Sequence, residues 1–181
     1  DPRTVELPDD EHRQGGEGGG SVGDDVGAGS TSTEPKSYPT GVYESAGPIR
    51  APQDDTVAAT PQIAGQDGVL VRVDWGLCDD DTACLLDTIQ KNLDSAASRN
   101  LKVALAVSDG HTIPPAVKSA CVTFPFVFNG ENQTMCLAWD TNYLQAKQDF
   151  IRQLGARFDD HPALGYVYFT GACSTNGFEG H

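Results

Sequence analysis

The stretch Gly68–Trp75, GVLVRVDW, decides the fold of this chain. It is rich in β-branched residues, which favour extended backbone, so we expect a strand. Side chains alternate along a strand, and here they form two sets: Val69, Val71 and Val73 on one face, and Leu70, Arg72 and Asp74 on the other. If the valines face a layer of helices, Arg72 and Asp74 point to the opposite side of the sheet.

Apolar strands and amphipathic helices alternate around this stretch. Upstream we expect a strand at Gly41–Ala46 and a short helix within 52–63, capped by Asp54 or Asp55. The elements expected downstream are a helix from Asp81 or Thr82 to Asn100, a strand Leu101–Val107, a helix Asn142–Phe158 and a strand Leu164–Thr170. Such alternation predicts an α/β fold with a parallel sheet. About four βα units make half of a TIM (β/α)₈ barrel, or a four-stranded piece of an open sheet.

The interior of a half-barrel would receive Arg72 and Asp74, with Asp74 nearer the end where loops follow the strands. A buried charge needs a partner or a ligand, so the two residues form either a structural ion pair or part of a site. On the following strand, the small Ala104 and Ala106 would leave room for Arg72 in a layered interior.

The cysteines fall in loops, where disulfides stabilise secreted proteins. Two local pairs are expected, Cys78–Cys84 and Cys121–Cys136, which leaves Cys173 unpaired. The second pair would hold the stretch 121–140, expected to be irregular, as an ordered rim. This pattern favours a secreted or envelope-tethered protein; the alternative is a cytosolic protein with free thiols.

Residues 1–37 differ in composition from the rest of the chain. They hold eight glycines, no aromatic residue, and nine acidic against three basic side chains. We expect a disordered acidic, Gly-rich linker here and a folded domain over 38–181. The whole chain carries a net charge of −14, which argues against nucleic acid as a partner. No apolar run reaches the roughly 20 residues that span a bilayer, so we expect no membrane insertion, only a tether through residues 1–37 after removal of a signal peptide.

Three motifs resemble (β/α)₈-barrel glycoside hydrolases of the β-galactosidase and endoglycanase type, and the resemblance covers about 41–181. The first, DGVLVRVDWG with LLDTIQKNLDSAASRNLKVALAV, is similar to the second strand, helix and third strand of those barrels. The second, CLAWDTNYLQAKQDFIRQLGARFDDHPALGYVYFTG, is similar to their third helix and fourth strand. The third is the loop GACSTNGFEGH, which follows the fourth strand.

The resemblance implies that Glu179 is the catalytic acid/base and that Asn176 contacts the sugar, in place of the family's asparagine, since Phe178 precedes Glu179 here. Glycoside hydrolysis uses two carboxyl groups that flank the scissile bond. In the resembled family the second glutamate follows strand seven. We therefore expect only the acid/base half of the site in this sequence, and no hydrolysis by the chain as given.

Other candidate site residues follow the second and third strands. Asp74, Asp109 and His111 are expected to bind sugar hydroxyls, the alternative being solvated loop side chains. Trp75 is expected to stack on a sugar, the alternative being packing. The acidic run within Cys78–Cys84 suits a calcium ion, but a helix N-terminus, whose dipole favours negative charge, is the preferred interpretation. No metal and no cofactor are expected.

Two functions of different classes fit these patterns. The leading hypothesis is a glycoside hydrolase acting on oligo- or polysaccharides. The alternative is a non-catalytic extracellular carbohydrate-binding or scaffold protein with a barrel-like fold. The fold alone does not distinguish these two functions, so the residues of the site have to decide between them.

Overall fold

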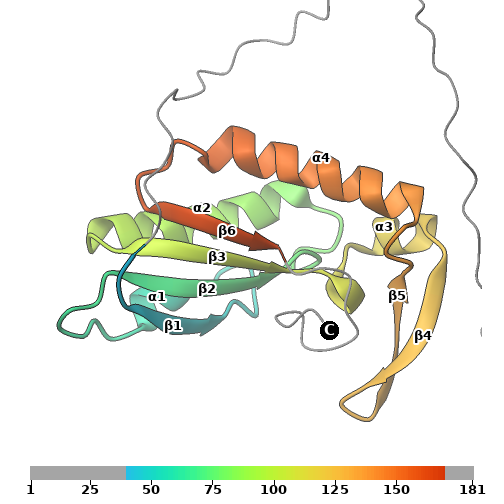
Figure 1. The fold of residues 1–181 in the computed structure, drawn as a ribbon, viewed down its shortest axis with the longest axis horizontal. Coiled ribbons are helices and arrows are strands. Elements are labelled where there is room, and N and C mark those ends of the chain that lie inside the picture. Colours follow the sequence, from blue (N-terminus) through green and yellow to red (C-terminus); the bar gives the residue numbers. More distant parts are fainter. Residues whose placement is uncertain (1–39, 170–181) are drawn as a thin grey trace, which may run out of the picture.

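The computed structural model describes residues 40–169 (Figure 1). Its elements in chain order are β1 (Tyr43–Pro48), α1 (Thr56–Ala59), β2 (Gly68–Asp74), α2 (Thr82–Ser98), β3 (Lys102–Ser108), the 3₁₀ turn η1 (Gly110–Thr112), α3 (Pro115–Ala120), β4 (Thr123–Phe128), β5 (Glu131–Cys136), α4 (Thr141–Phe158) and β6 (Leu164–Phe169). The expected alternation of strands and helices is confirmed. One hairpin, β4–β5, and the short helix α3 interrupt it.

Four strands form a parallel sheet in the order β1-β2-β3-β6. Strands β2 and β3 pair without a break from Gly68 opposite Lys102 to Asp74 opposite Ser108, so both end at the same level. Strand β1 begins and ends two residues later than predicted. Pro48 is the last residue of β1, which is tolerated because β1 pairs only with β2 within residues 40–169. The α/β class with a parallel sheet is thereby confirmed.

The two faces of β2 are used differently, as the alternation predicts. Its three valines are at most 1% exposed and lie in one core with residues of α2 and α4. Figure 1 shows both helices on the same side of the sheet. On the other face, Arg72 lies beside Ala106 of β3, which lies beside Tyr168 of β6. This register agrees with the expectation that a small residue accommodates Arg72, and the Arg72 guanidinium donates to Ser45 Oγ of β1 at 3.2 Å.

Helix α4 covers the sheet with a narrower apolar stripe than its sequence suggests. Four of its residues are at most 3% exposed: Tyr143, Phe150, Leu154 and Phe158. From the apolar pattern of this helix, Leu144 and Ile151 are expected on the buried face as well; the structure contradicts this, because each is 40% exposed. Each follows a buried residue of the stripe by one position, about 100° around the helix, and so lies at its margin.

A buried amide attaches α1 to α2. Asn92 of α2 is 1% exposed. Its Oδ1 accepts hydrogen bonds from the backbone N–H and the hydroxyl of Thr56, at 3.0 and 3.1 Å. Its Nδ2 donates to the carbonyl oxygens of Asp54 and Thr88, at 3.1 and 3.0 Å. One side chain thus satisfies backbone groups around the start of α1, and Asp55 caps the same helix, as expected.

Residues 123–136, which lie in the stretch expected to be irregular, form the antiparallel hairpin β4–β5. Asn129 and Gly130 connect the strands with φ values of 51° and 82°. Two successive positive φ angles are what a two-residue type I′ turn requires, and Asn-Gly is the dipeptide that favours it. The prediction of an irregular loop was wrong because this turn signal outweighs the length of the segment.

Candidate functional site

A cavity of about 270 Å³ opens at the C-terminal edge of the sheet, between the end of β2 and the segment after β3. Its lining includes Asp74, Leu77, Asp79, His111, Thr112 and Ile113. Ligands of parallel α/β sheets bind outside the carboxyl ends of the strands, so this cavity is the candidate site. Two of the residues predicted from the sequence, Asp74 and His111, meet here.

The loop after β2 is held against η1 by its backbone. The N–H of Trp75 donates to the carbonyl of Ser108 at 2.8 Å, and the N–H of Gly76 donates to that of Thr112 at 2.6 Å. A Cβ at Gly76 would lie 2.7 Å from the Thr112 oxygen, so this approach requires glycine. The close contact is what brings Asp74 and His111, 37 positions apart in the sequence, to one cavity.

The pKa values of Asp74 and His111 both differ from their ordinary values. Burial raises the pKa of the Asp74 carboxyl group, against the charge of His111 and hydrogen bonds from Thr112 and Ser108. Burial also lowers the pKa of His111, against the charge of Asp74 and together with that of Lys118. Both groups are thus shifted toward their neutral forms. Together they offer hydrogen-bond donors and acceptors suited to the hydroxyl groups of a neutral ligand.

Asp109 lies apart from the cavity lining. It is 3% exposed and forms an ion pair with Lys147 of α4, with 2.5 Å between Oδ2 and Nζ. The Tyr143 hydroxyl donates to the same oxygen at 2.7 Å. The expectation that Asp109 binds a ligand is not supported by this placement, because its carboxylate links the end of β3 to α4.

Trp75 also lies apart from the cavity, in the core. It is 5% exposed, and its ring stacks on Phe150 with centroids 5.2 Å apart and lies 6.5 Å from Tyr143. The ring faces are therefore used by α4, so stacking of Trp75 on a sugar is not supported. The packing alternative describes this residue.

Two aromatic residues of β4 lie beside His111. The centroid of its ring is 4.9 Å from that of Phe128 and 6.0 Å from that of Phe126. Sequence reasoning did not assign these residues to the site. The alternation from Phe124 to Phe128, followed directly by Asn-Gly, predicts an aromatic face on a hairpin strand and was the signal available.

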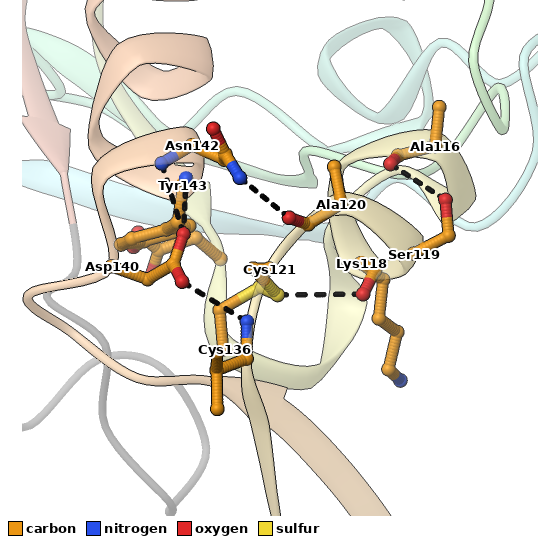
Figure 2. The surroundings of a disulfide bond; sticks show 11 residues. Ala116, Lys118, Ser119, Ala120, Cys121, Cys136, Asp140, Asn142 and Tyr143 are labelled. Atoms are coloured by element: carbon orange, nitrogen blue, oxygen red, sulfur yellow. Dashed lines mark hydrogen bonds between the residues drawn. A yellow bond between two sulfur atoms is a disulfide. The ribbon is translucent and has the colours of Figure 1, made fainter.

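The base of the hairpin is fixed to the helices (Figure 2). The expected disulfide Cys121–Cys136 joins the end of α3 to the end of β5. Asp140 accepts hydrogen bonds from the backbone N–H of Val122, at 3.0 Å, and from two N–H groups at the start of α4, at 2.9 and 3.1 Å. These three hydrogen bonds lower the pKa of the Asp140 carboxyl group, and the one from Val122 contributes most. Asp140 thus caps the N-terminus of α4 and also holds Val122, next to the base of the hairpin.

Two aspartates of the acidic run within Cys78–Cys84 accept hydrogen bonds from backbone N–H groups. The Cys78–Cys84 disulfide forms as predicted. Asp81 caps α2 by accepting from the N–H of Cys84 at 3.0 Å, and Asp80 accepts from the N–H of Ala116 in α3 at 2.7 Å. This supports the interpretation as a helix N-terminus over a calcium loop. Within residues 40–169, no cluster of three or more His, Cys, Asp or Glu side chains is arranged to hold a metal ion.

Glu179, Asn176 and Cys173 lie outside the described residues. Comparison of the chain with protein-family models, with curated proteins and with solved structures found no match. In the described part of the chain, no helix combines the length and apolar character needed to cross a membrane. The functional assignment therefore depends on the geometry of the cavity and its surroundings.

Proposed function

We propose that this chain forms the first half of the barrel of a glycoside hydrolase. The observation that carries the proposal is the cavity at the C-terminal edge of the sheet, where Asp74 and His111 meet. In this proposal both side chains bind sugar hydroxyls, and Glu179 supplies the acid/base carboxyl group. Residues 1–37 serve as a linker, and the two disulfides support secretion or attachment outside the cell.

The arrangement of strands supports a barrel over an open sheet. Apart from the hairpin, each strand lies next to its predecessor in the sequence, in the order β1-β2-β3-β6. A doubly wound open sheet instead reverses its strand order and carries helices on both faces. Here α2 and α4 share one face (Figure 1), as the outer helices of a barrel do.

The chemistry of the cavity suits a neutral, hydroxyl-rich substrate. Asp74 and His111 line the same cavity, where a carboxyl group and an imidazole can exchange hydrogen bonds with hydroxyl groups of a bound molecule. Cleavage of a glycosidic bond needs a protonated carboxyl group on the leaving oxygen and a second carboxylate. In this proposal Glu179 takes the first role, and the second role requires a further carboxylate.

The test is hydrolysis of nitrophenyl glycosides and of oligosaccharides by the full-length protein and its variants. Glu179→Gln is expected to lower kcat by at least about a thousandfold with an unchanged far-UV spectrum, since general acid catalysis and the leaving-group step are lost. Azide or another small nucleophile restoring turnover of the activated glycoside would support the acid/base role. Activity of Glu179→Gln near the wild-type rate would refute that role.

The second candidate, a non-catalytic carbohydrate-binding protein, is favoured by one observation, the aromatic side chains of β4 next to His111. It predicts saccharide binding that depends on Asp74 without hydrolysis by the full-length protein. Turnover of any glycoside that Glu179→Gln abolishes would exclude it.

A further inference from the structure

The hairpin β4–β5 has two unlike faces. Phe124, Phe126 and Phe128 alternate with more exposed residues along β4 and point to one side, where all three are half-buried. Val127, between the last two, is 67% exposed and points to the other side. We refer to the row Phe124, Phe126 and Phe128 as the phenylalanine face.

The phenylalanine face continues directly into the candidate site. His111 contacts both Phe126 and Phe128, and it also lines the cavity with Asp74. Figure 1 shows the hairpin standing beyond the ends of the strands to which the arrowheads of the sheet point. A ligand that leaves the cavity past His111 therefore meets these rings.

The hairpin is held in place before any ligand arrives. The Cys121–Cys136 disulfide closes its base, Asp140 ties the preceding residue to α4, and the Asn-Gly turn closes its tip. A surface that is already ordered loses little conformational entropy on binding. Such rigidity suits recognition and serves no evident purpose in the parallel sheet, which the hairpin does not join within the described part of the chain.

The chemistry of the face selects its occupant. Sugar rings present apolar C–H faces together with hydroxyl groups, and half-exposed aromatic rings next to polar groups are how proteins bind such amphipathic molecules. The acidic chain, at −14, disfavours a polyanion. Phe124 and Phe126 have centroids 6.2 Å apart, and Phe128 extends the row, so the row is longer than a single sugar unit.

We propose that the phenylalanine face binds the sugar units of an extended neutral saccharide that lie outside the Asp74–His111 cavity. This proposal rests on the proposed function and adds to it a substrate class, oligomers or polymers with several units. It assigns Phe126 and Phe128 to substrate binding.

The test is calorimetric titration of the protein with glucose, galactose, mannose and xylose and with the β-1,4-linked hexasaccharides of the same sugars. At least one hexasaccharide is expected to bind at least tenfold more tightly than its monomer. Phe128→Ala and Phe126→Ala are expected to lower that affinity at least tenfold. Val127→Ala, the matched control on the opposite face of the same strand, is expected to leave it unchanged.

Two further variants separate ring stacking from folding. Phe128→Tyr keeps the ring and is expected to retain affinity, whereas Phe128→Leu keeps the apolar volume and is expected to lose it. Equal effects of Phe128→Ala and Val127→Ala, or binding of no hexasaccharide, would overturn the proposal. A dimer in light scattering that Phe126→Ala dissociates would also overturn it, because the face would then be an interface between copies.

The outcomes distinguish this inference from the proposed function. If full-length protein hydrolyses glycosides and Asp74→Asn impairs it while Phe128→Ala does not affect hexasaccharides, the hydrolase stands and the phenylalanine face fails. If hexasaccharides bind in a Phe128-dependent way without any hydrolysis, the face stands and the hydrolase fails.

Discussion

Asp109 and Lys147 form an ion pair with 2.5 Å between Oδ2 and Nζ, from the end of β3 to the middle of α4. The aspartate side chain is 1% exposed and the lysine side chain 18%. The Lys147 ammonium also lies 5.6 Å from the centroid of the Tyr143 ring and 5.9 Å from that of Phe169. The pair therefore fixes α4 over the sheet in a setting with little solvent.

Asp109→Asn is expected to destabilise the protein by about 3 kcal/mol, because it leaves the Lys147 ammonium in a poorly solvated position without its counter-charge. The double variant Asp109→Asn with Lys147→Met removes both charges and is expected to recover part of the loss. Urea unfolding measures both. A single variant as stable as the wild type would show that the pair contributes nothing to folding.

Asp74→Asn is expected to separate function from stability. The folded pKa of Asp74 is raised above 3.8, so the folded state binds the proton more tightly than the unfolded state. The free energy of unfolding of the wild type therefore falls as the pH rises from the ordinary value of 3.8 through the raised folded pKa of Asp74. Asp74→Asn removes the ionisable group and with it this fall in stability. We expect at least tenfold weaker saccharide binding, about 1.4 kcal/mol, with unchanged or higher stability at pH 7. Titration and urea unfolding between about pH 3 and pH 7 measure the two effects.

Asp140→Asn is expected to change the acid side of the stability profile in the opposite sense. The pKa of Asp140 is lowered in the folded state, so its contribution is complete above the ordinary value of 3.8 and is lost as the pH falls through the lower folded pKa. Asparagine can still cap α4, but its amide nitrogen cannot accept from Val122. The variant should lose stability at neutral pH and approach the wild type as the pH falls through the lowered folded pKa of Asp140, which acid titration of urea unfolding detects.

Removing the Cys121–Cys136 disulfide is expected to cost about 3 kcal/mol, because the unfolded chain regains the entropy that the bridge removes from a loop with a sequence separation of 15. Removing the Cys78–Cys84 bridge, with a separation of 6, should cost about 2 kcal/mol and serves as the comparison for stability. Removal of Cys121–Cys136 is expected to weaken hexasaccharide binding. Serine double variants, compared by thermal unfolding and titration, provide the measurement; a hexasaccharide affinity unchanged by removal of Cys121–Cys136 would contradict the role of the hairpin.

Asn92→Leu is expected to destabilise the protein by about 1–3 kcal/mol, because it leaves the backbone N–H of Thr56 without its acceptor. The loss should be local to α1, since the leucine fills much of the volume in α2. Hydrogen exchange of the α1 amides is expected to accelerate more than that of β2 or β3. Uniform acceleration across the sheet would show that Asn92 supports the whole core.

The parts of the fold that were predictable from the sequence are those set by local rules. Alternation in Gly68–Asp74 defines β2 and its two faces, and Asp81 and Asp140 mark the starts of α2 and α4. The disulfides follow from cysteines that bracket short segments. Each of these features depends on residues that are close in the chain, which is why the sequence indicates them.

What was not predictable depends on distant residues. From the sequence alone, Asp109 looks like a solvated acidic residue of a loop. Its ion pair with Lys147, 38 positions later, depends on how α4 packs on the sheet. Trp75 follows a strand, and only the position of Phe150 in α4 decides that its ring enters the core and not the cavity. Asn92 is polar at a helical position that faces α1, and no local pattern marks it as buried. Of the residues at the candidate site, Asp74 and His111 were predictable from the sequence, but the phenylalanine face beside His111 was not identified.

The hairpin can change in length without disturbing the sheet. Among residues 40–169 its strands pair only with each other, its base is closed by a covalent bond, and its tip is a two-residue turn. Adding one residue to each strand would reverse which side chains face His111, whereas adding two would extend the aromatic row and keep its direction. Insertions in steps of two per strand would therefore lengthen the ligand that the protein accommodates. Under the proposed binding role, ligand length could diversify in this way among variants of the protein while the parallel sheet, and the cavity at its edge, stay constant.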